Sequence, residues 1–328
     1  MGGDFGPEVT VPATATALSK HPDAEFIFVG DEELILPLVE EHGLADDSRI
    51  ALFHTSEQVE MDDKPSVALR SRRESSMRLA INMVKEGRAG ATVSAGNTGA
   101  LMAIARFVLK TLPGIDRPAI CGAIPGVNGK THMLDLGANV DSSSEELFRF
   151  AVMGSVLVSA IDGEESPTVA LLNIGEEEIK GNDRVKQTAL LLEQSALNYS
   201  GFVEGGDIFK AVVDVVVCDG FVGNVALKSS EGAAQMLADM AREEFTRGLF
   251  RKVSALFAKP ALGAMRDRAD PRRYNGASLL GLRGIVVKSH GGADALSFAS
   301  AIDVAVAEIE SDVPSRINDR LEEFLVET

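Results

Sequence analysis

Short apolar runs rich in β-branched residues alternate with amphipathic segments along most of this 328-residue sequence. The runs have the length of strands, and the segments between them have the apolar spacing of helices. We expect strands at 25–30, 49–54, 91–95, 119–124, 131–136, 168–174, 212–218 and 284–288, and helices at about 31–42, 75–87, 98–110, 143–159, 183–197, 222–245 and 293–310. Such alternation is typical of a largely parallel sheet with helices on both faces.

One local signal breaks the parallel pattern. Asn128 and Gly129 lie between two predicted strands, and this dipeptide favours a tight hairpin, so we expect one antiparallel pair. No repeat, low-complexity tract or linker divides the chain. We therefore predict a three-layer α/β/α fold with a mainly parallel, Rossmann-like sheet, in which residues 1–328 form one large domain or a bilobed version of it.

Charge and composition exclude several classes of function. The formal net charge is −17, which disfavours nucleic acid as a partner, and the absence of Trp leaves few aromatic rings for stacking on bases. The two cysteines, Cys121 and Cys218, are too far apart for a short metal or redox motif. Because the sequence has neither a signal-peptide pattern nor a long apolar run, we expect a cytoplasmic protein.

Residues 247–273 differ from the rest of the chain, since they carry eight Lys or Arg against two Asp. Leu249, Val253, Leu256 and Phe257 fall on one side of a helix, and Arg251 and Lys252 border that apolar stripe. Pro260 is expected to end or kink the helix. A basic amphipathic protrusion of this kind is consistent with docking on an anionic membrane surface, and the alternative is a dimer-interface or core-packing helix.

Five predicted strands end in loops rich in glycine and asparagine, at 94–99, 135–139, 173–176, 218–224 and 288–292. In an open parallel sheet such loops share the carboxyl edge, where ligands bind. Glycine lets the backbone approach an anion closely, and helix starts offer free N–H groups. We expect one anion-binding cleft built from all five loops, although each loop taken alone has a structural alternative as a turn or helix cap.

Several cations accompany these loops. Lys180, Lys228, Lys288 and His290 lie in or just beyond them, and for Lys180 the alternative is pairing with the neighbouring glutamates. The sequence has no nucleotide-binding glycine fingerprint, no complete P-loop and no zinc motif. Asp135, Asp141 and Asp219 have the chemistry of Mg²⁺ ligands, but carboxylates at strand ends also cap helices. We expect no metal and no cofactor.

Five stretches of the sequence carry a family resemblance: MGGDFGP at 1–7, VSAGNTGA at 93–100, NIGEEEIKGN at 173–182, VCDGFVGNVA at 217–226 and GIVVKSHG at 284–291. Together they resemble the phosphate acyltransferase family of bacterial phospholipid synthesis (the PlsX type), from Met1 to about residue 325. There are two departures. Phe5 stands where the family often has His, and the sequence begins at a motif that a short strand precedes in the family.

The resemblance implies an α/β/α homodimer similar to phosphotransacetylases and isocitrate-type dehydrogenases. It also implies reversible reaction of a long-chain acyl-[acyl carrier protein] with inorganic phosphate to give acyl phosphate. A membrane glycerol-3-phosphate acyltransferase would consume that product, and the enzyme would be cytoplasmic and peripherally membrane-associated.

Acyl transfer from a thioester to phosphate needs an anion cradle and oxyanion donors rather than a nucleophilic side chain. We expect substrate or phosphate to be bound by Ser94, Gly96, Asn97, Thr98, Gly99, Asp135, Gly175, Glu176, Asp219, Gly220 and Lys288. Asn139, Asn224 and His290 are predicted to line the acyl carbonyl, and Lys180 to neutralise phosphate or assist departure of the thiolate.

The acyl carrier protein is itself acidic, so it should dock on a basic patch. Arg70 and Arg73, next to Arg72 and Arg78, form one candidate, and residues 247–273 form the other. Three other functions stay open: a short-chain phosphotransacetylase that uses coenzyme A thioesters, a metal-dependent decarboxylating dehydrogenase, and a non-catalytic membrane scaffold of the same fold.

Overall fold

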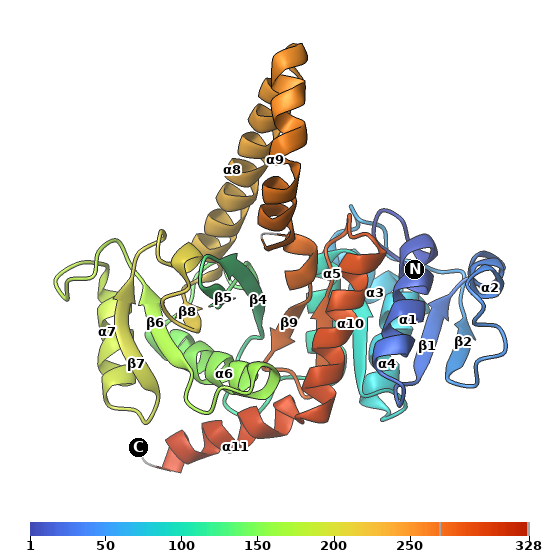
Figure 1. Ribbon diagram of the computed structural model, residues 1–328. Coiled ribbons are helices and arrows are strands. Elements are labelled where there is room, and N and C mark those ends of the chain that lie inside the picture. The colour runs from blue at the N-terminus through green and yellow to red at the C-terminus, as the bar shows by residue number, and fades with distance from the viewer. Residues whose placement is uncertain (269, 327–328) are drawn as a thin grey trace.

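The computed structural model describes residues 1–268 and 270–326. Two sheets form the middle layer (Figure 1). In the smaller sheet, β1 (Phe26–Gly30) pairs in parallel with β2 (Ile50–His54). The larger sheet has eight strands in the order β3 (Ala91–Ser94), β10 (Ile285–Lys288), β9 (Ala277–Leu280), β4 (Ala119–Gly126), β5 (Gly129–Leu134), β8 (Val215–Val217), β6 (Thr168–Leu172) and β7 (Asn198–Val203).

The direction of the strands reverses in the middle of the larger sheet. Three neighbouring pairs are antiparallel, β10–β9, β9–β4 and β4–β5, whereas the remaining pairs are parallel. The predicted antiparallel hairpin at Asn128 and Gly129 is confirmed between β4 and β5. The two further antiparallel pairs both involve β9, a strand that was not anticipated. Consequently β3 and β10 run opposite to β5, β8 and β6. The expected meeting of all five loops at one carboxyl edge is therefore wrong.

Helices cover both faces, as the three-layer prediction requires. The alternation along each strand decides which side chain faces which layer: Val216 of β8 packs on one side, and Val215 and Val217 pack on the other. One face carries α3 (Pro65–Ser71), α4 (Ser76–Lys85), α5 (Thr98–Leu109) and the start of α8 (Gly220–Thr246). The other carries α1 (Pro7–Lys20), α2 (Glu32–Glu41), α6 (Ser144–Asp162), α7 (Asp183–Glu193), α10 (Ala295–Glu310) and α11 (Val313–Val326).

Five elements had no sequence prediction: α1, α3, α11, β7 and β9. The sequence of α1 contains Pro12 and several β-branched residues, which are poor helix formers. Its helix is held by tertiary packing, since Val11 and Ala13 are completely buried. In β7, Gly201 has a positive φ and the sequence NYSGFV has the composition of a loop. Local sequence preference was therefore overruled by packing in these elements.

Helices α8 and α9 (Leu249–Arg268) form a long hairpin that projects from the body of the molecule (Figure 1). Pro260 lies inside α9, so the prediction that it ends or kinks the helix there is wrong as to ending. Pro260 and Leu256, whose carbonyl group proline frees, are both exposed, so water can hydrogen-bond that group. Short 3₁₀ turns, η1 (Ile208–Lys210) and η2 (Pro271–Tyr274), complete the chain.

The apolar stripe of α9 has no cover from the rest of the described chain. Val253, Leu256 and Phe257 are 49%, 68% and 81% exposed, whereas the side chain of Leu249 lies outside the described residues. Arg251 pairs with Glu244 of α8, and Lys252 is exposed. Within the described chain, no helix is both long and apolar enough to cross a membrane.

Candidate active site

The first part of the site lies where β3 and β10 end side by side, with Lys288 in register with Ser94. Beyond these strand ends come the starts of α5 and α10, and the N-terminal segment crosses them, because the Asp4 N–H donates to the Gly291 carbonyl at 2.9 Å. We call residues 2–4, 94–99 and 288–292 the β3–β10 half-site. It therefore unites two of the five predicted loops with the opening motif.

Lys288 is the buried cation of this half-site. Its Nζ donates to the carbonyl of Ala95 at 3.3 Å and also to that of Ser289. Burial lowers the pKa of Lys288 to about 8, the nearby Asp4 opposes this shift, and Lys228 of α8 reinforces it. A bound anion would favour the charged ammonium, so this position suits a negatively charged substrate group.

The α5 side of the half-site is held by close packing. A Cβ on Gly96 would lie 2.7 Å from Met77 Cε, the flexible end of a long side chain, whereas one on Gly99 would lie 2.8 Å from Pro65 Cγ in a rigid ring, so Gly99 is the more constrained of the two. The Asn97 side chain is already engaged: Oδ1 caps the helix through the Ala100 N–H, and Nδ2 donates to carbonyls of the 61–63 loop. The free anion donors at this helix start are instead the N–H groups of Thr98 and Gly99, both exposed residues.

His290 of the 288–292 segment is exposed, and hydrogen bonds to neighbouring residues fix its orientation. Its Nδ1 accepts from the Gly292 N–H at 3.1 Å, so the neutral ring carries its proton on Nε2. The His290 N–H donates to Asn275 Oδ1 at 3.0 Å, and Asn275 Nδ2 donates to the buried Ser289 hydroxyl at 2.7 Å. Sequence reasoning missed Asn275, because nothing local marks a residue that acts on a loop beyond the next two strands.

The second part of the site lies where β5 and β8 end, with Leu134 in register with Val217. Asp135 is fully buried there, and its carboxylate accepts five hydrogen bonds, from the N–H groups of Ile120, Gly137, Ala138 and Asn139 and from Asn139 Nδ2. Burial raises the pKa of Asp135, and these hydrogen bonds oppose the rise.

Asn139 is 3% exposed, and its Nδ2 also donates to the Pro118 carbonyl at 2.9 Å. Both side chains are thus hydrogen-bonded within and around the 135–139 loop, and the predicted substrate contacts of Asp135 and Asn139 stay predictions.

The start of α8 packs tightly against that loop. Asp219 caps the helix through the Val222 N–H at 2.9 Å, and the Gly220 N–H donates to the Asn139 carbonyl at 2.8 Å. A Cβ on Gly223 would lie 1.9 Å from the Asp135 carbonyl oxygen, so only glycine fits. Asn224 follows on the next position and is exposed beside Gly137. We call residues 135–139 and 218–224 the β5–β8 half-site.

Arg184 closes one side of the β5–β8 half-site from the first turn of α7. Its guanidinium donates to Asp219 at 3.3 Å and to the Ser142 carbonyl at 2.9 Å, and it also pairs with Asp141. Two of the three carboxylates considered as magnesium ligands are thus paired with arginine. Within the described residues, no group of three His, Cys, Asp or Glu side chains is arranged to hold a metal ion.

The two half-sites lie at opposite strand ends but on the same face of the sheet. Leu136 packs against the core under α5 and also against the core that includes Ala226 of α8. Lys228, one turn beyond Asn224, is close enough to Lys288 to affect its pKa. The face between α5 and α8 therefore connects the β3–β10 half-site with the exposed side of the α8 start.

The loop after β6 follows a strand that lies beside β8, with Leu171 in register with Val217. Lys180 and Glu176 are exposed, the Lys180 N–H donates to the Glu177 carbonyl at 2.9 Å, and Asn173 Nδ2 donates to the Lys180 carbonyl at 3.4 Å. Gly175 is buried under this loop. Among the described residues, no hydrogen bond joins 173–181 to either half-site, and the predicted roles of Gly175, Glu176 and Lys180 stay predictions.

This chain is similar to the proteins of a known family. Residues 1–316 match the model of the family described as fatty acid synthesis protein. The chain belongs to this family. It is 58% identical over 325 residues to the phosphate acyltransferase of Alkalilimnicola ehrlichii, covering 99% of this chain and 95% of the relative. The phosphate acyltransferase of Methylococcus capsulatus is also 58% identical, over 98% of this chain and 95% of its own length. The predicted family and the predicted enzyme class, phosphate acyltransferase, are confirmed.

Solved structures of lower identity share the fold. A phosphotransacetylase from Streptococcus pyogenes superposes with a TM-score of 0.61 at 18% identity, covering 93% of this chain and 92% of its own. EutD phosphotransacetylase from Staphylococcus aureus gives a TM-score of 0.59 at 17% identity, covering 92% of both chains. The predicted likeness of the fold to phosphotransacetylases is therefore confirmed.

Proposed function

We propose that this chain transfers a long-chain acyl group from acyl-[acyl carrier protein] to inorganic phosphate in phospholipid synthesis, reversibly and without a cofactor. The observation that carries the proposal is the β3–β10 half-site, where a buried lysine and the start of α5 meet in a chain of this family. Phosphate uses both features, because its oxygens accept from backbone N–H groups and its charge favours the Lys288 ammonium.

In the proposed reaction, the N–H groups of Thr98 and Gly99 and the Lys288 ammonium hold phosphate. One phosphate oxygen attacks the thioester carbonyl, the carbon–sulfur bond breaks, and the carrier leaves as a thiolate. Asn224 Nδ2 and the Nε2–H of His290 would donate to the oxyanion that forms. Asp135 and Asn139 act as positioning residues, since they fix the wall on which Asn224 stands.

Lys180 keeps a proposed role on the leaving-group side. It is exposed, and its side chain takes part in none of the ion pairs among the described residues. An unpaired ammonium on a long stem can meet the departing thiolate, and Glu176 would then compete for it. This assignment requires the loop after β6 to approach the cleft when substrate binds.

For docking of the carrier, we favour the α3 patch. Arg70 and Arg73 are exposed, whereas Arg72 pairs with Asp63 and Glu57. Pro65, the first residue of α3, lies against Gly99 of the phosphate half-site. An acidic carrier seated on this patch would deliver its thioester next to the phosphate.

The α8–α9 hairpin then serves a second docking function. We propose that its exposed apolar stripe rests on an anionic membrane surface, so that this cytoplasmic enzyme, as a homodimer, releases acyl phosphate near a membrane glycerol-3-phosphate acyltransferase. Support comes from the exposure of Leu256 and Phe257 beside Lys252 and Lys259. The finding that no described helix could span a membrane is compatible with such peripheral contact.

The decisive assay supplies labelled inorganic phosphate with palmitoyl-[acyl carrier protein], palmitoyl coenzyme A or acetyl coenzyme A. We expect labelled acyl phosphate with the carrier thioester and none when the thioester is omitted. Preferential turnover of acetyl coenzyme A would assign a short-chain phosphotransacetylase instead, and no product with any donor would favour a scaffold.

The docking patch is tested in the same assay by comparing R70E/R73E with the matched hairpin variant R251E/K252E. We expect R70E/R73E alone to raise the KM for the carrier thioester and to flatten the salt dependence of kcat/KM. If only the hairpin variant shows the higher KM and the flatter salt dependence, the carrier docks on α9 instead.

A further inference from the structure

The loop between β2 and α3, residues 55–64, reaches both loops of the β3–β10 half-site. Asn97 Nδ2 donates to the Met61 carbonyl at 2.8 Å and to the Asp63 carbonyl at 3.0 Å. On the other side, Met61 Cε lies 3.1 Å from the position that a Cβ on Gly291 would occupy. Met61 therefore contacts both the start of α5 and the 288–292 segment.

The 55–64 loop is anchored on both sides of Met61. Arg72, just beyond α3, pairs with Glu57 at 3.8 Å and with Asp63 at 3.4 Å. Val59 is buried in the core under α5. Between these anchors, residues 60–62 are exposed. Their side chains can therefore meet a ligand without any rearrangement of the loop backbone.

The Gly291 end of the half-site carries exposed apolar side chains. Met61 is 44% exposed, and Phe5, which is 53% exposed, follows Asp4. The Asp4 N–H donates to the Gly291 carbonyl at 2.9 Å, so the opening motif is joined to the same residue that Met61 contacts. Phosphate gains nothing from an apolar surface. This end of the half-site therefore suits the apolar part of the second substrate.

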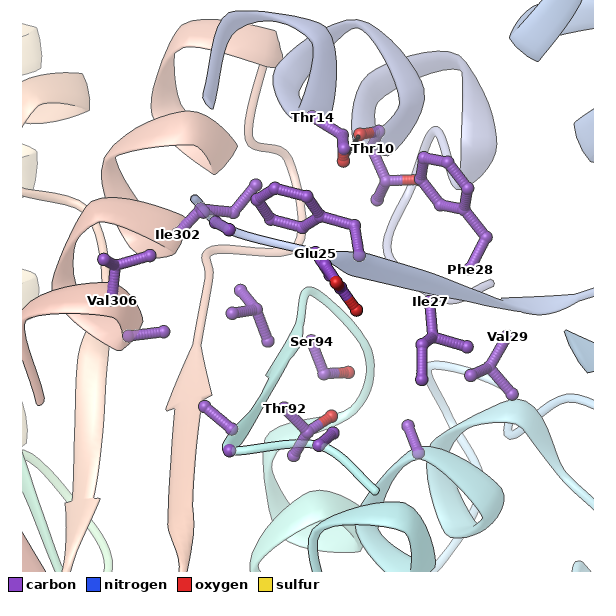
Figure 2. Close-up of a pocket in the computed structure, with 18 of the residues that line it drawn as sticks. Thr10, Thr14, Glu25, Ile27, Phe28, Val29, Thr92, Ser94, Ile302 and Val306 are labelled. Carbon is purple, nitrogen blue, oxygen red and sulfur yellow. Dashed lines mark hydrogen bonds between the residues drawn. The ribbon is translucent and has the colours of Figure 1, made fainter. Parts of the chain in front are cut away.

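A second apolar surface lines a cavity of about 680 Å³ between β1 and β3 (Figure 2). Ile27, Phe28 and Ile302 contribute to its wall. The described lining of this cavity does not include the four residues of the half-site that hold the reacting groups in the proposed reaction, which are Thr98, Gly99, Lys288 and His290. Gly291, by contrast, follows His290 directly and lies against Met61. The Met61 surface is therefore the one that adjoins the reacting carbonyl.

We propose that Met61 is a specificity-determining residue, whose side chain packs on the first methylene groups of the acyl chain, next to the thioester carbonyl. The inference rests on the proposed function, in which the Nε2–H of His290 donates to the oxygen of that carbonyl. The acyl chain then leaves the carbonyl past Gly291 and along Met61. Methionine suits this contact, because its unbranched thioether adapts its shape to an apolar partner.

The alternative partner of Met61 is the arm of the carrier that bears the thioester sulfur. This arm is the same for every acyl group, so the loss of a contact with it would affect all donors equally. A contact with the acyl chain would instead depend on the chain, because an acetyl group has no methylene beyond the carbonyl. A series of donors on one carrier therefore separates the two contacts.

The experiment measures kcat/KM for acetyl-, butyryl-, hexanoyl- and palmitoyl-[acyl carrier protein] at saturating phosphate. We expect Met61→Ala to lower kcat/KM about 10- to 100-fold for the three longer donors and less than about twofold for the acetyl donor. Met61→Leu keeps the apolar volume and should restore most of the activity. Leu190→Ala removes a similarly exposed apolar side chain from α7, outside both half-sites, and should change none of the four values.

The fold of the variant is checked separately. Because the Met61 side chain is exposed, Met61→Ala should melt within about 2 °C of the wild type, and its KM for phosphate should be unchanged.

An equal loss with all four donors would assign Met61 to the arm of the carrier and overturn the inference, as would an unchanged kcat/KM for the palmitoyl donor. If the wild-type protein forms no acyl phosphate from any of the donors, the proposed function itself fails. The two failures are distinguishable, because the wild-type rate decides the proposed function and the ratio of variant to wild type decides the role of Met61.

Discussion

Lys288 of β10 lies opposite Ser94 of β3, in register at the carboxyl ends of two parallel neighbours. Through this pairing a buried ammonium comes to lie beside the start of α5, although the two residues are far apart in the sequence. The β3–β10 half-site therefore depends on the pairing of the two strands, and neither loop would form it alone.

The charge of Lys288 should govern the pH dependence of phosphate use. Its pKa of about 8 means that the ammonium is present below that pH and is lost as pH rises through it, so kcat/KM for phosphate should fall above pH 8. Lys288→Gln should lower kcat/KM about 100-fold at pH 7. Lys288→Arg should retain activity into more alkaline solution. Rates measured from pH 6 to 10 check this, and an identical alkaline limb in wild type and Lys288→Arg would contradict it.

Two asparagines of the β5–β8 half-site should respond differently to alanine. Asn224→Ala removes an exposed donor, so kcat should fall about 10²–10³-fold with little change in Tm. Asn139→Ala removes a buried amide that bonds Asp135 and Pro118, so it should destabilise the fold by about 2–3 kcal/mol. Parallel kinetics and denaturant melts separate the effects. Equal stability losses in both variants would remove Asn224 from the proposed oxyanion site.

Two glycines of α8 form a matched pair. At Gly223 a Cβ would meet the Asp135 carbonyl oxygen at 1.9 Å, so Gly223→Ala should cost at least about 4 kcal/mol or prevent folding. At Gly232 no atom lies within 4 Å of the added Cβ, so Gly232→Ala should stabilise the helix by about 0.5–1 kcal/mol. Chemical denaturation measures both, and a neutral Gly223→Ala would contradict the packing described for the α8 start.

Glu308 should make stability depend on pH. Burial raises its pKa to about 7, and the Ser278 hydroxyl donates to it. Between its unfolded pKa of 4.5 and about 7, the folded state holds a proton that the unfolded state releases, so stability falls as pH rises through this window and levels off above it. The loss is on the order of 3 kcal/mol. Urea melts at pH 5 and 8 measure it, and Glu308→Gln should abolish this component; a Gln variant with an unchanged slope would show another group to be responsible.

The apolar stripe of α9 should determine vesicle binding. Phe257→Glu places charge on the stripe and should reduce partition onto phosphatidylglycerol vesicles at least about tenfold without changing the Tm. Ser254→Glu adds the same charge to an exposed position of α9 outside the stripe and serves as the control. If Phe257→Glu instead dissociates a dimer in sedimentation experiments, the stripe is a subunit interface.

The layered fold could be predicted because its central strands are short, continuous apolar runs, as in Val215–Val217. The order and direction of the strands could not be predicted, since β9 follows the helical hairpin and η2, and its four residues, ASLL, carry no strand signal of their own. That strand completes the reversal of direction, and the reversal separates the loops that the sequence appeared to place at one edge.

At the site, loop composition correctly marked the strand ends but could not rank the polar residues within them. Asn97, Asn139 and Asn224 cannot be told apart by their chemistry in the sequence. In the structure, the side-chain amides of the first two donate to backbone carbonyls, and only the third residue is exposed. Asn275 and Arg184 act on loops from other elements. Such roles depend on tertiary neighbours, which a single sequence does not encode locally.

One carboxylate, Asp135, gathers the N–H groups of the loop that faces the start of α8. That wall of the cleft is consequently rigid before any substrate arrives, because the entropy of ordering it is lost during folding. A substrate that binds here therefore loses little binding free energy to the ordering of its receptor.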